Sequence, residues 1–442
     1  MDIWTLFGSF DSGVIRKVRD RLPPRLEGIV WKIVVVLKFF GVTFWFMVTS
    51  KKHVPSPMTI YWISPDRIVY LTNYKKVDIS DPASPQESVF PSNLRGKVVD
   101  GNWDIADFKF ADVDHMDAFK QRIQEGAEWK DTRFYKRFLK EIESGRTVWN
   151  MKNKNDLDQH CRHHDELYEK IKKEGYHPNI DEKTKIASLN EIDVNIGRNG
   201  EYLFQNGVHR LSIAKALGIK YVPVMVYIRH KQWQDFRKRL IEYARLEPGG
   251  KLYQPPIHPD LADIPYDLQK HNWQCIMETI EKHLSKKNGL MLDIGSNLGF
   301  FCHKFEDLGY RCYAVESELS ASQIAEKIRI AENKKFTIIN KSIFDVEFVK
   351  TMEFDVVLAL NIFHWFLQTK TSFSQLKDLL KNLKTSELFF EPQLPSETQM
   401  KNAYINFNET EFVDFILQYT SLNKASLIYT DPNGRPLFHL FK

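Results

Sequence analysis

The amino-acid sequence predicts an α/β fold, with a doubly wound parallel sheet in the C-terminal part of the chain. The first observation is a series of short apolar runs, rich in β-branched and aromatic residues, at Phe336–Asn340, Phe354–Leu360 and Leu388–Glu391. The second is that longer helix-compatible stretches, such as Ala321–Glu332 and Phe373–Leu383, separate these runs. Strands that alternate with helices in this way indicate βαβ units, in which ligands bind beyond the carboxyl ends of the strands.

The third observation is a strand–turn–helix–strand segment that begins with MLDIGSNLG. Its first apolar run ends at Asp293, then Gly295, Asn297 and Gly299 follow at alternate positions, and its second apolar run ends at Glu316. This order is typical of a nucleoside-binding unit, because a glycine turn lets the backbone approach the ligand and a carboxylate about 20 residues further on binds the ribose hydroxyls. Asn297 takes the position of the second glycine of a dinucleotide-binding turn, so the turn suits a nucleoside without phosphates. An ordinary strand–turn–helix, with glycines used for packing, is the alternative.

The same segment resembles motifs I and II of the class I S-adenosylmethionine-dependent methyltransferases, and its wording DIGSNLGFF is close to that of the FkbM-type branch. The resemblance implies a Rossmann-like methyltransferase domain with S-adenosylmethionine as its cofactor. On this basis we expect Glu316 to contact the ribose hydroxyls and Asp293 to orient the ammonium group of the methionine moiety, directly or through water. The resemblance implies that Asp345 accepts from the adenine amino group. The expected cofactor-binding residues are Asp293, Gly295, Asn297, Gly299, Glu316, Asp345 and Asn361.

A candidate catalytic base follows the strand Phe354–Leu360. Methyl transfer from a sulfonium is an in-line displacement, so the protein must position the acceptor and remove a proton when the nucleophile is a hydroxyl or an amine. His364 lies at the ligand-facing edge beside Asn361 and Trp365, and the pKa of a histidine suits proton removal near neutrality. Glu391 is the second candidate, and a packed or orienting role is the alternative for His364.

The middle of the chain carries a second pattern, a short strand, a turn, a helix and a proline-containing strand within Glu201–Ile228. The sequence NGVHRLSIAKALGIKYVPV resembles the ParB/sulfiredoxin-like domain, whose matching motif at a helix start contacts nucleotide phosphates. By this resemblance Asn206, Gly207, His209 and Arg210 bind a phosphate or another anion, as the free N–H groups of a helix start would favour. The alternative is a scaffold in which Arg210 pairs with an internal carboxylate.

Charged helices are expected at Asp117–Glu125, Asp131–Glu143 and Asn155–Glu174. The last of them contains a group of potential metal ligands: His160, Cys161, His163 and His164. His160 and His164 share a helix face, but no further ligand with zinc-type spacing follows nearby. We therefore interpret the helix as solvated and assign no metal.

The chain divides by composition into an apolar and basic N-terminal segment (1–55), a ParB-like α+β domain with a helical insertion (56–246), a proline-rich linker (247–265) and the methyltransferase domain (266–442). The apolar stretch Ile29–Val48 is long enough to span a bilayer but contains Lys32 and Lys38. Membrane association and burial within the following domain both stay open for this stretch.

The composition is that of a globular chain: 442 residues, 43% hydrophobic, 27% charged and a net charge of +5. Its lysines are scattered and form no basic stripe, which counts against nucleic acid as a partner. The four cysteines lack paired or metal-type spacing, which favours a reducing, cytoplasmic compartment.

The leading hypothesis is a methyltransferase for a small-molecule, sugar or nucleotide-linked acceptor, a choice that the FkbM-type resemblance implies, with a ParB-like module that binds an anionic group. The alternative is a nucleotide- or nucleic-acid-binding ParB-like protein whose C-terminal domain senses S-adenosylmethionine without catalysis.

Overall fold

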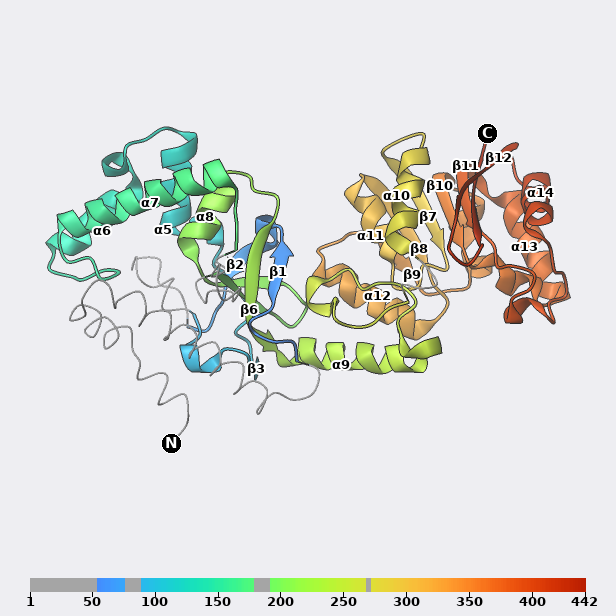
Figure 1. The fold of residues 1–442 in the computed structure, drawn as a ribbon, viewed down its shortest axis with the longest axis horizontal. Coiled ribbons are helices and arrows are strands. Elements are labelled where there is room, and N and C mark those ends of the chain that lie inside the picture. The colour runs from blue at the N-terminus through green and yellow to red at the C-terminus, as the bar shows by residue number, and fades with distance from the viewer. Residues whose placement is uncertain (1–53, 76–88, 179–190, 268–271) are drawn as a thin grey trace. The chain divides into compact units, whose positions relative to one another are not determined.

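The structure, a computed structural model, describes residues 54–75, 89–178, 191–267 and 272–442. The chain divides into two compact units, residues 1–238 (unit 1) and 239–442 (unit 2) (Figure 1). The apolar stretch Ile29–Val48 lies outside the described residues. Within the described ranges, no helix is both long enough and apolar enough to cross a membrane.

Unit 1 contains a six-stranded mixed sheet. Its strands are β1 (Ile60–Ile63), β2 (Ile68–Leu71), β3 (Val98–Val99), β4 (Ile192–Ile196), β5 (Tyr202–Asn206) and β6 (Val222–His230). The order is β1-β6-β4-β5-β2, and β3 pairs with the end of β6. Every residue of β6 is buried, which explains why this strand reads as an almost continuous apolar run.

The helices of unit 1 include α9 (Lys231–Leu246), which was not predicted from the sequence, and four others that overlap the predicted ones but differ from them at their ends. These four are α5 (Asp114–Phe119), α6 (Arg133–Glu143), α7 (Lys154–Glu174) and α8 (Val208–Ala216), and α9 continues into unit 2. The helix α7 begins at Asn153, whose side chain accepts from the N–H of Asp156 at 3.0 Å, and it ends at Gly175. Contacts join α5 to α6 and α8, and α7 to α6 and α8, so these helices form one layer.

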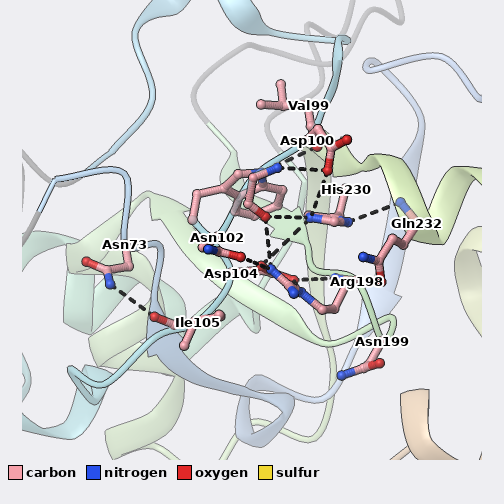
Figure 2. Close-up of polar contacts among 12 residues, drawn as sticks. Asn73, Val99, Asp100, Asn102, Asp104, Ile105, Arg198, Asn199, His230 and Gln232 are labelled. Carbon is pink, nitrogen blue, oxygen red and sulfur yellow. Dashed lines mark hydrogen bonds and ion pairs between the residues drawn. The ribbon is translucent and has the colours of Figure 1, made fainter.

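An ion pair between the partly exposed Arg198 and the buried Asp104 holds the turn between β4 and β5 (Figure 2). The Arg198 guanidinium donates from Nε to Asp104 Oδ2 at 2.8 Å and from Nη2 to Oδ1 at 2.7 Å, and its backbone N–H donates to Oδ2 at 2.7 Å. Burial opposes ionisation of Asp104, but the hydrogen bonds from Arg198 hold the pKa of this carboxyl group below its ordinary value. His230 makes a 2.9 Å hydrogen bond to the Gly101 carbonyl beside the pair. These contacts join the turn to the segment after β3, which indicates a structural role.

Unit 2 contains a seven-stranded sheet in the order β12-β13-β11-β10-β7-β8-β9. The strands are β7 (Gly289–Ile294), β8 (Tyr310–Val315), β9 (Thr337–Ile339), β10 (Glu353–Leu360), β11 (Lys384–Glu391), β12 (Lys424–Thr430) and β13 (Pro436–Phe441). The helices are α10 (Trp273–His283), α11 (Phe300–Asp307), α12 (Leu319–Ala331), α13 (Lys370–Asn382) and α14 (Glu409–Tyr419). The predicted strands and helices of this part of the chain are thus confirmed.

Helices cover both faces of this sheet (Figure 1). Met291 of β7 packs in a core with α10 and α11, whereas its neighbour Leu292 packs in the opposite core with α13 and α14. Because successive side chains of a strand point to opposite faces, a strand that is covered on both faces is apolar along its length. This two-sided burial is what the predicted doubly wound arrangement requires.

The expectation of a purely parallel sheet is wrong at one edge. The strand β13 runs antiparallel to both β11 and β12. A tight turn reverses the chain between β12 and β13: Asp431 Oδ1 accepts from the N–H groups of Asn433 and Arg435, both at 2.8 Å, and Gly434 has a φ of +89°. A short hairpin can join only antiparallel strands, so this turn determines the direction of β13.

The proline-rich segment 247–265 packs within unit 2. Leu252, Gln254, His258 and Leu261 are buried, and the Trp273 indole at the start of α10 donates to the carbonyl of Tyr253 at 2.8 Å. The segment therefore contributes side chains to the interior of the unit.

Candidate functional site

The turn after β7 lies where the order of the parallel strands reverses, with β8 and β9 on one side and β10 and β11 on the other. In sheets of this type the crevice at the reversal point binds ligands. The N–H groups of Gly295 and Ser296 donate to the Val315 carbonyl at 2.9 and 3.1 Å. The turn is therefore fixed against the end of β8, and Gly299 then begins α11.

Gly295 is required at its position for two reasons. Its φ is +74°, and a Cβ atom there would lie 2.7 Å from Cδ1 and 2.8 Å from Cγ1 of Ile362. A side chain would therefore be strained in its backbone conformation and would collide with Ile362, two residues after the end of β10. Asn297 has a φ of +49°, which asparagine tolerates better than most residues.

Glu316 closes the crevice from the end of β8. Its Oε2 accepts from the N–H of Asn297 at 2.9 Å, and its Oε1 accepts from the N–H of Glu318 at 2.8 Å. Burial raises the pKa of this carboxyl group. The structure thus brings the glycine turn and the downstream carboxylate together, as the sequence spacing predicts.

Asp293 is buried beneath the turn, 3% exposed, and its Oδ2 lies 3.9 Å from the Cys302 sulfur of α11. Burial and the nearby charge of Glu316 raise the pKa of Asp293 to about 7. Within the described part of the chain, neither carboxyl group has a lysine or an arginine at ion-pair distance. A ligand that carries positive charge and hydroxyl donors would therefore stabilise both carboxylates.

The last expected contact of this half of the crevice is Asp345. It lies in the single turn Ile343–Asp345 after β9 and is exposed. The structure places it on the same side of β7 as Glu316, but its role in binding stays a prediction.

On the other side of the reversal point, Asn361 and Glu391 lie against each other at the ends of β10 and β11. The Asn361 N–H donates to the Glu391 carbonyl at 2.9 Å, and the Asn361 side-chain amide donates to Glu391 Oε2. Glu391 is fully buried, and burial raises the pKa of its carboxyl group to about 8. Asn361 therefore contacts a carboxyl group that ordinary pH leaves largely protonated.

His364 lies nearby in the turn Phe363–Leu367 and is 4% exposed. Burial, with the positive charge of Arg435, lowers the pKa of His364 to about 4. This corrects the expectation of a histidine that titrates near neutrality, because the sequence could not show how deeply the ring is buried. The guanidinium of Arg435 is itself paired with Glu397, at 2.7 Å from Nε to Oε1.

Sequence reasoning missed two residues of the segment before α10. Gln254 is 3% exposed, and its Oε1 accepts from the N–H of Phe300 in the first turn of α11 at 3.2 Å. Burial raises the pKa of the Tyr253 hydroxyl, as does the nearby charge of Glu391. The prolines around these residues indicated a linker, and nothing in the local pattern pointed to a site.

In unit 1 the structure separates the residues of the expected anion site. Asn206 is exposed at the end of β5, and its Oδ1 accepts from the N–H of Gly207 at 2.8 Å. Arg210 pairs with the buried carboxylate of Glu191 at 3.5 Å, and the His209 ring lies among other histidines in the helical layer. Burial lowers the pKa of His209 to about 3. In the scaffold alternative, Arg210 pairs with an internal carboxylate, and the structure contains such a pair between Arg210 and Glu191.

The interpretation of α7 as a solvated helix is wrong for one of its faces. Cys161 and His164 are buried, and His160 is half-buried. The His160 and His164 rings lie 4.2 Å apart and contact His209 of α8. The face is buried because α7 packs against α6 and α8, a tertiary contact that the charge pattern of a single helix does not reveal.

Comparison with known proteins agrees with the geometry of unit 2. Residues 292–383 match the family model described as a methyltransferase domain. No curated protein matches the chain.

Solved structures match over part of the chain. The bifunctional kinase–methyltransferase WbdD is 16% identical over 46% of this chain and 46% of its own, with a TM-score of 0.36 in its 2.2 Å crystal structure. The N-methyltransferase NodS of Bradyrhizobium japonicum is 14% identical over 38% of this chain and 94% of its own, with a TM-score of 0.31. A putative S-adenosylmethionine-dependent methyltransferase of Listeria monocytogenes is 16% identical over 37% of this chain and 94% of its own, with a TM-score of 0.28. The match to WbdD thus spans less than half of that protein's length.

The family match covers the turn after β7, Glu316 and the strand β10, which are the parts that build the crevice. The crevice also offers the paired carboxyl groups that a cationic nucleoside ligand needs. Unit 2 therefore carries a methyltransferase domain, and its cofactor is S-adenosylmethionine.

Proposed function

We propose that the protein is an S-adenosylmethionine-dependent methyltransferase that acts on a hydroxyl group of a small-molecule, sugar or nucleotide-linked acceptor. The observation that carries the proposal is the contact between the Glu316 carboxylate and the N–H of Asn297, 2.9 Å, at the reversal point of the sheet. The hydroxyl acceptor rests on the resemblance of the turn sequence DIGSNLGFF to the FkbM-type branch.

The roles of the binding residues follow from their surroundings. Bound S-adenosylmethionine supplies a methyl group on a positively charged sulfur. Two backbone N–H groups hold the carboxylate of Glu316 in place, so its remaining lone pairs are oriented before a ribose arrives. Asp293 is buried next to Glu316, and a bound ammonium group would favour its ionised form. Gly295 and Gly299 leave the backbone open to the ligand, and Asp345 is the proposed acceptor from the adenine amino group.

We propose His364 as the group that removes the proton from the acceptor. Its ring contacts Trp365, with centroids 4.8 Å apart, and Trp365 is 54% exposed beside it. No hydrogen-bond partner of His364 Nδ1 is found among the described residues. A pKa of about 4 leaves this nitrogen unprotonated and available as an acceptor at neutral pH, although it makes the ring a weaker base than an exposed histidine. Glu391 is the second candidate.

Calorimetric titration with S-adenosylmethionine tests the cofactor assignment. Loss of the Glu316 carboxylate in Glu316→Ala should weaken binding about 30-fold, which corresponds to about 2 kcal/mol for charge-assisted hydrogen bonds. Glu347→Ala is the matched control, because Glu347 is exposed and its ion pair is a surface contact with Lys350. Equal affinities for the wild type and Glu316→Ala would overturn the assignment.

The proposal for unit 1 is a ParB-like module that binds an anionic group at the start of α8 through Asn206, Gly207 and Arg210. The His209 ring lies in the histidine cluster of the helical layer and takes no part in this binding. The start of α8 at Gly207 supports it, because the first N–H groups of a helix favour an anion. The pairing of Arg210 with Glu191 supports the scaffold alternative. A panel of nucleotides titrated against the wild type and Arg210→Ala distinguishes the two, since a scaffold binds none of them.

Binding of S-adenosylmethionine without any turnover would favour the sensor alternative for unit 2.

A further inference from the structure

Four histidines from three helices meet in the helical layer of unit 1. They are His115 of α5, His160 and His164 of α7, and His209 of α8. One ring nitrogen from each lies within 4.8 Å of the corresponding nitrogen of every other. His160 and His164 are one helical turn apart and so share a face. The other two lie in segments far from α7 in the sequence, so only the fold brings the four together.

Five of the eight ring nitrogens of this cluster are buried and have no hydrogen-bond partner among the described residues. His115 is 2% exposed and His164 is fully buried. Among the described residues, no hydrogen-bond partner is found for Nε2 of His115, His160 and His209, or for either ring nitrogen of His164. Buried polar atoms of native proteins are nearly always paired, so these unpaired nitrogens point to a partner outside the chain, which one nitrogen of each histidine can share.

Packing alone does not explain the choice of histidine. The cluster lies among aromatic rings, including Phe134, whose centroid is 4.7 Å from that of His115. Phenylalanine would fill the same space without any unpaired polar atom. The four imidazoles therefore point to a function of their nitrogens.

The backbone next to the cluster is held in a strained conformation. Trp149 and Asn150 have φ angles of +54° and +64°, in a two-residue turn closed by the bridge between Val148 and Met151. A bulky residue with positive φ is uncommon. This conformation places the Trp149 ring on His115, stacked at 27° with centroids 4.4 Å apart. The ring covers one side of the cluster and restricts the orientation of His115.

We propose that His115, His160, His164 and His209 form a binding site for a divalent transition-metal ion of the zinc type. Imidazole nitrogens suit zinc and its neighbours, whereas magnesium and calcium require oxygen ligands. Four nitrogens about 2.0–2.1 Å from a tetrahedral ion are about 3.3 Å apart, so small rotations of the side chains close the cluster on the ion. Cys161 follows His160 directly in the sequence but is outside the group of side chains whose ligand atoms meet here.

The site is structural in character. Four protein ligands fill a tetrahedral ion and leave no position for a substrate. The ion would link α5, α7 and α8, and α8 packs against β4 of the sheet. It would therefore fasten the helical layer to the rest of unit 1. The site is independent of the methyltransferase chemistry of unit 2.

The test uses the full-length chain without a histidine tag, treated with a chelator and then titrated with Zn²⁺ or Co²⁺. The matched variants are His160→Gln and His163→Gln, three residues apart on α7. The side chain of His163 is 69% exposed and outside the cluster. We expect the wild type and His163→Gln to bind one equivalent of zinc, and His160→Gln to bind at least about 100-fold more weakly, because changes that only disturb a ligand already cost 10–100-fold.

The cobalt spectrum of the wild type gives a readout that needs no variant. Four nitrogen ligands should give the intense visible absorption of tetrahedral cobalt without a thiolate charge-transfer band. Three results would overturn the proposal: no zinc or cobalt bound by the wild type, equal losses in the two variants, or a thiolate band that places a cysteine on the ion.

Discussion

The substitution Gly295→Ala tests how the turn after β7 is built. An alanine at a φ of +74° costs about 1 kcal/mol more than glycine. Its Cβ would lie 2.7 Å from Ile362 Cδ1, and relief of that overlap inside a packed unit costs about 1–3 kcal/mol. The free energy of unfolding of unit 2 should therefore fall by about 2–4 kcal/mol.

The control for this prediction is Gly434→Ala in the turn between β12 and β13. Gly434 has a φ of +89°, and nothing lies within 4 Å of a Cβ added there. This variant carries the backbone cost without the collision, so it should lose about 1 kcal/mol. The difference between the two variants isolates the contact with Ile362.

Urea unfolding of the full chain gives the measurement. The transition of unit 2 is the one that S-adenosylmethionine moves to higher urea, because the ligand binds the folded unit. Equal losses for Gly295→Ala and Gly434→Ala would refute the collision with Ile362. Affinity for S-adenosylmethionine, measured by calorimetry, should fall at least about 10-fold in Gly295→Ala alone, since a displaced turn costs more than 1.4 kcal/mol of binding.

Three further predictions concern ionisable groups. Burial raises the pKa of Glu391 to about 8 in the folded state, so the folded state keeps a proton that the unfolded state releases. The free energy of unfolding should therefore fall as pH rises from about 5 to 8. In urea unfolding at both pH values, Glu391→Gln should show a smaller fall than the wild type, and an equal pH dependence of the two proteins would contradict the assignment. Asp104→Asn should cost about 1–2 kcal/mol at pH 7 by weakening the pair with Arg198, whose side chain is partly exposed. Because the pKa of Asp104 is lowered, the wild type should lose this advantage only as pH falls below about 4. A constant difference between the two proteins at pH 3 and 7 would be inconsistent with this. Once an acceptor is known, His364→Gln should lower kcat at least about 100-fold if this ring removes the proton, whereas unchanged turnover would take it out of the mechanism.

The elements that could be predicted from the sequence are those with a local signal. The turn after β7 could be located because its glycines follow an apolar run directly, and its spacing to Glu316 identified the partner across the crevice. The two-sided burial of β10 is likewise visible as an uninterrupted apolar run from Val356 to Leu360. Each of these features depends on residues that are close in the sequence or that lie at the ends of two consecutive strands.

The features that sequence reasoning missed have different causes. The hairpin between β12 and β13 had a signal, because Asp431-Pro-Asn-Gly434 between two apolar runs is a turn sequence. The histidine cluster had only a partial sequence signal. His160 and His164 share a helix face, but His115 lies 45 residues before His160, and His209 lies 45 residues after His164. Spacing rules for metal sites look for neighbours along the chain, and these ligands are neighbours only after α5, α7 and α8 have packed. The same holds for Gln254, whose partner is the first turn of α11.

Burial reverses what residue type suggests about acid–base chemistry at the ends of β10 and β11. An exposed histidine would titrate near neutrality and an exposed glutamate near 4.5. Here burial, with Arg435, lowers the pKa of His364 to about 4, and burial raises the pKa of Glu391 to about 8. At pH 7 the histidine is therefore unprotonated and the carboxyl is largely protonated, the reverse of what their residue types suggest. The two candidates then differ in their pH profiles: a reaction that depends on unprotonated His364 keeps its rate down to about pH 4, whereas one that depends on ionised Glu391 loses rate below about pH 8.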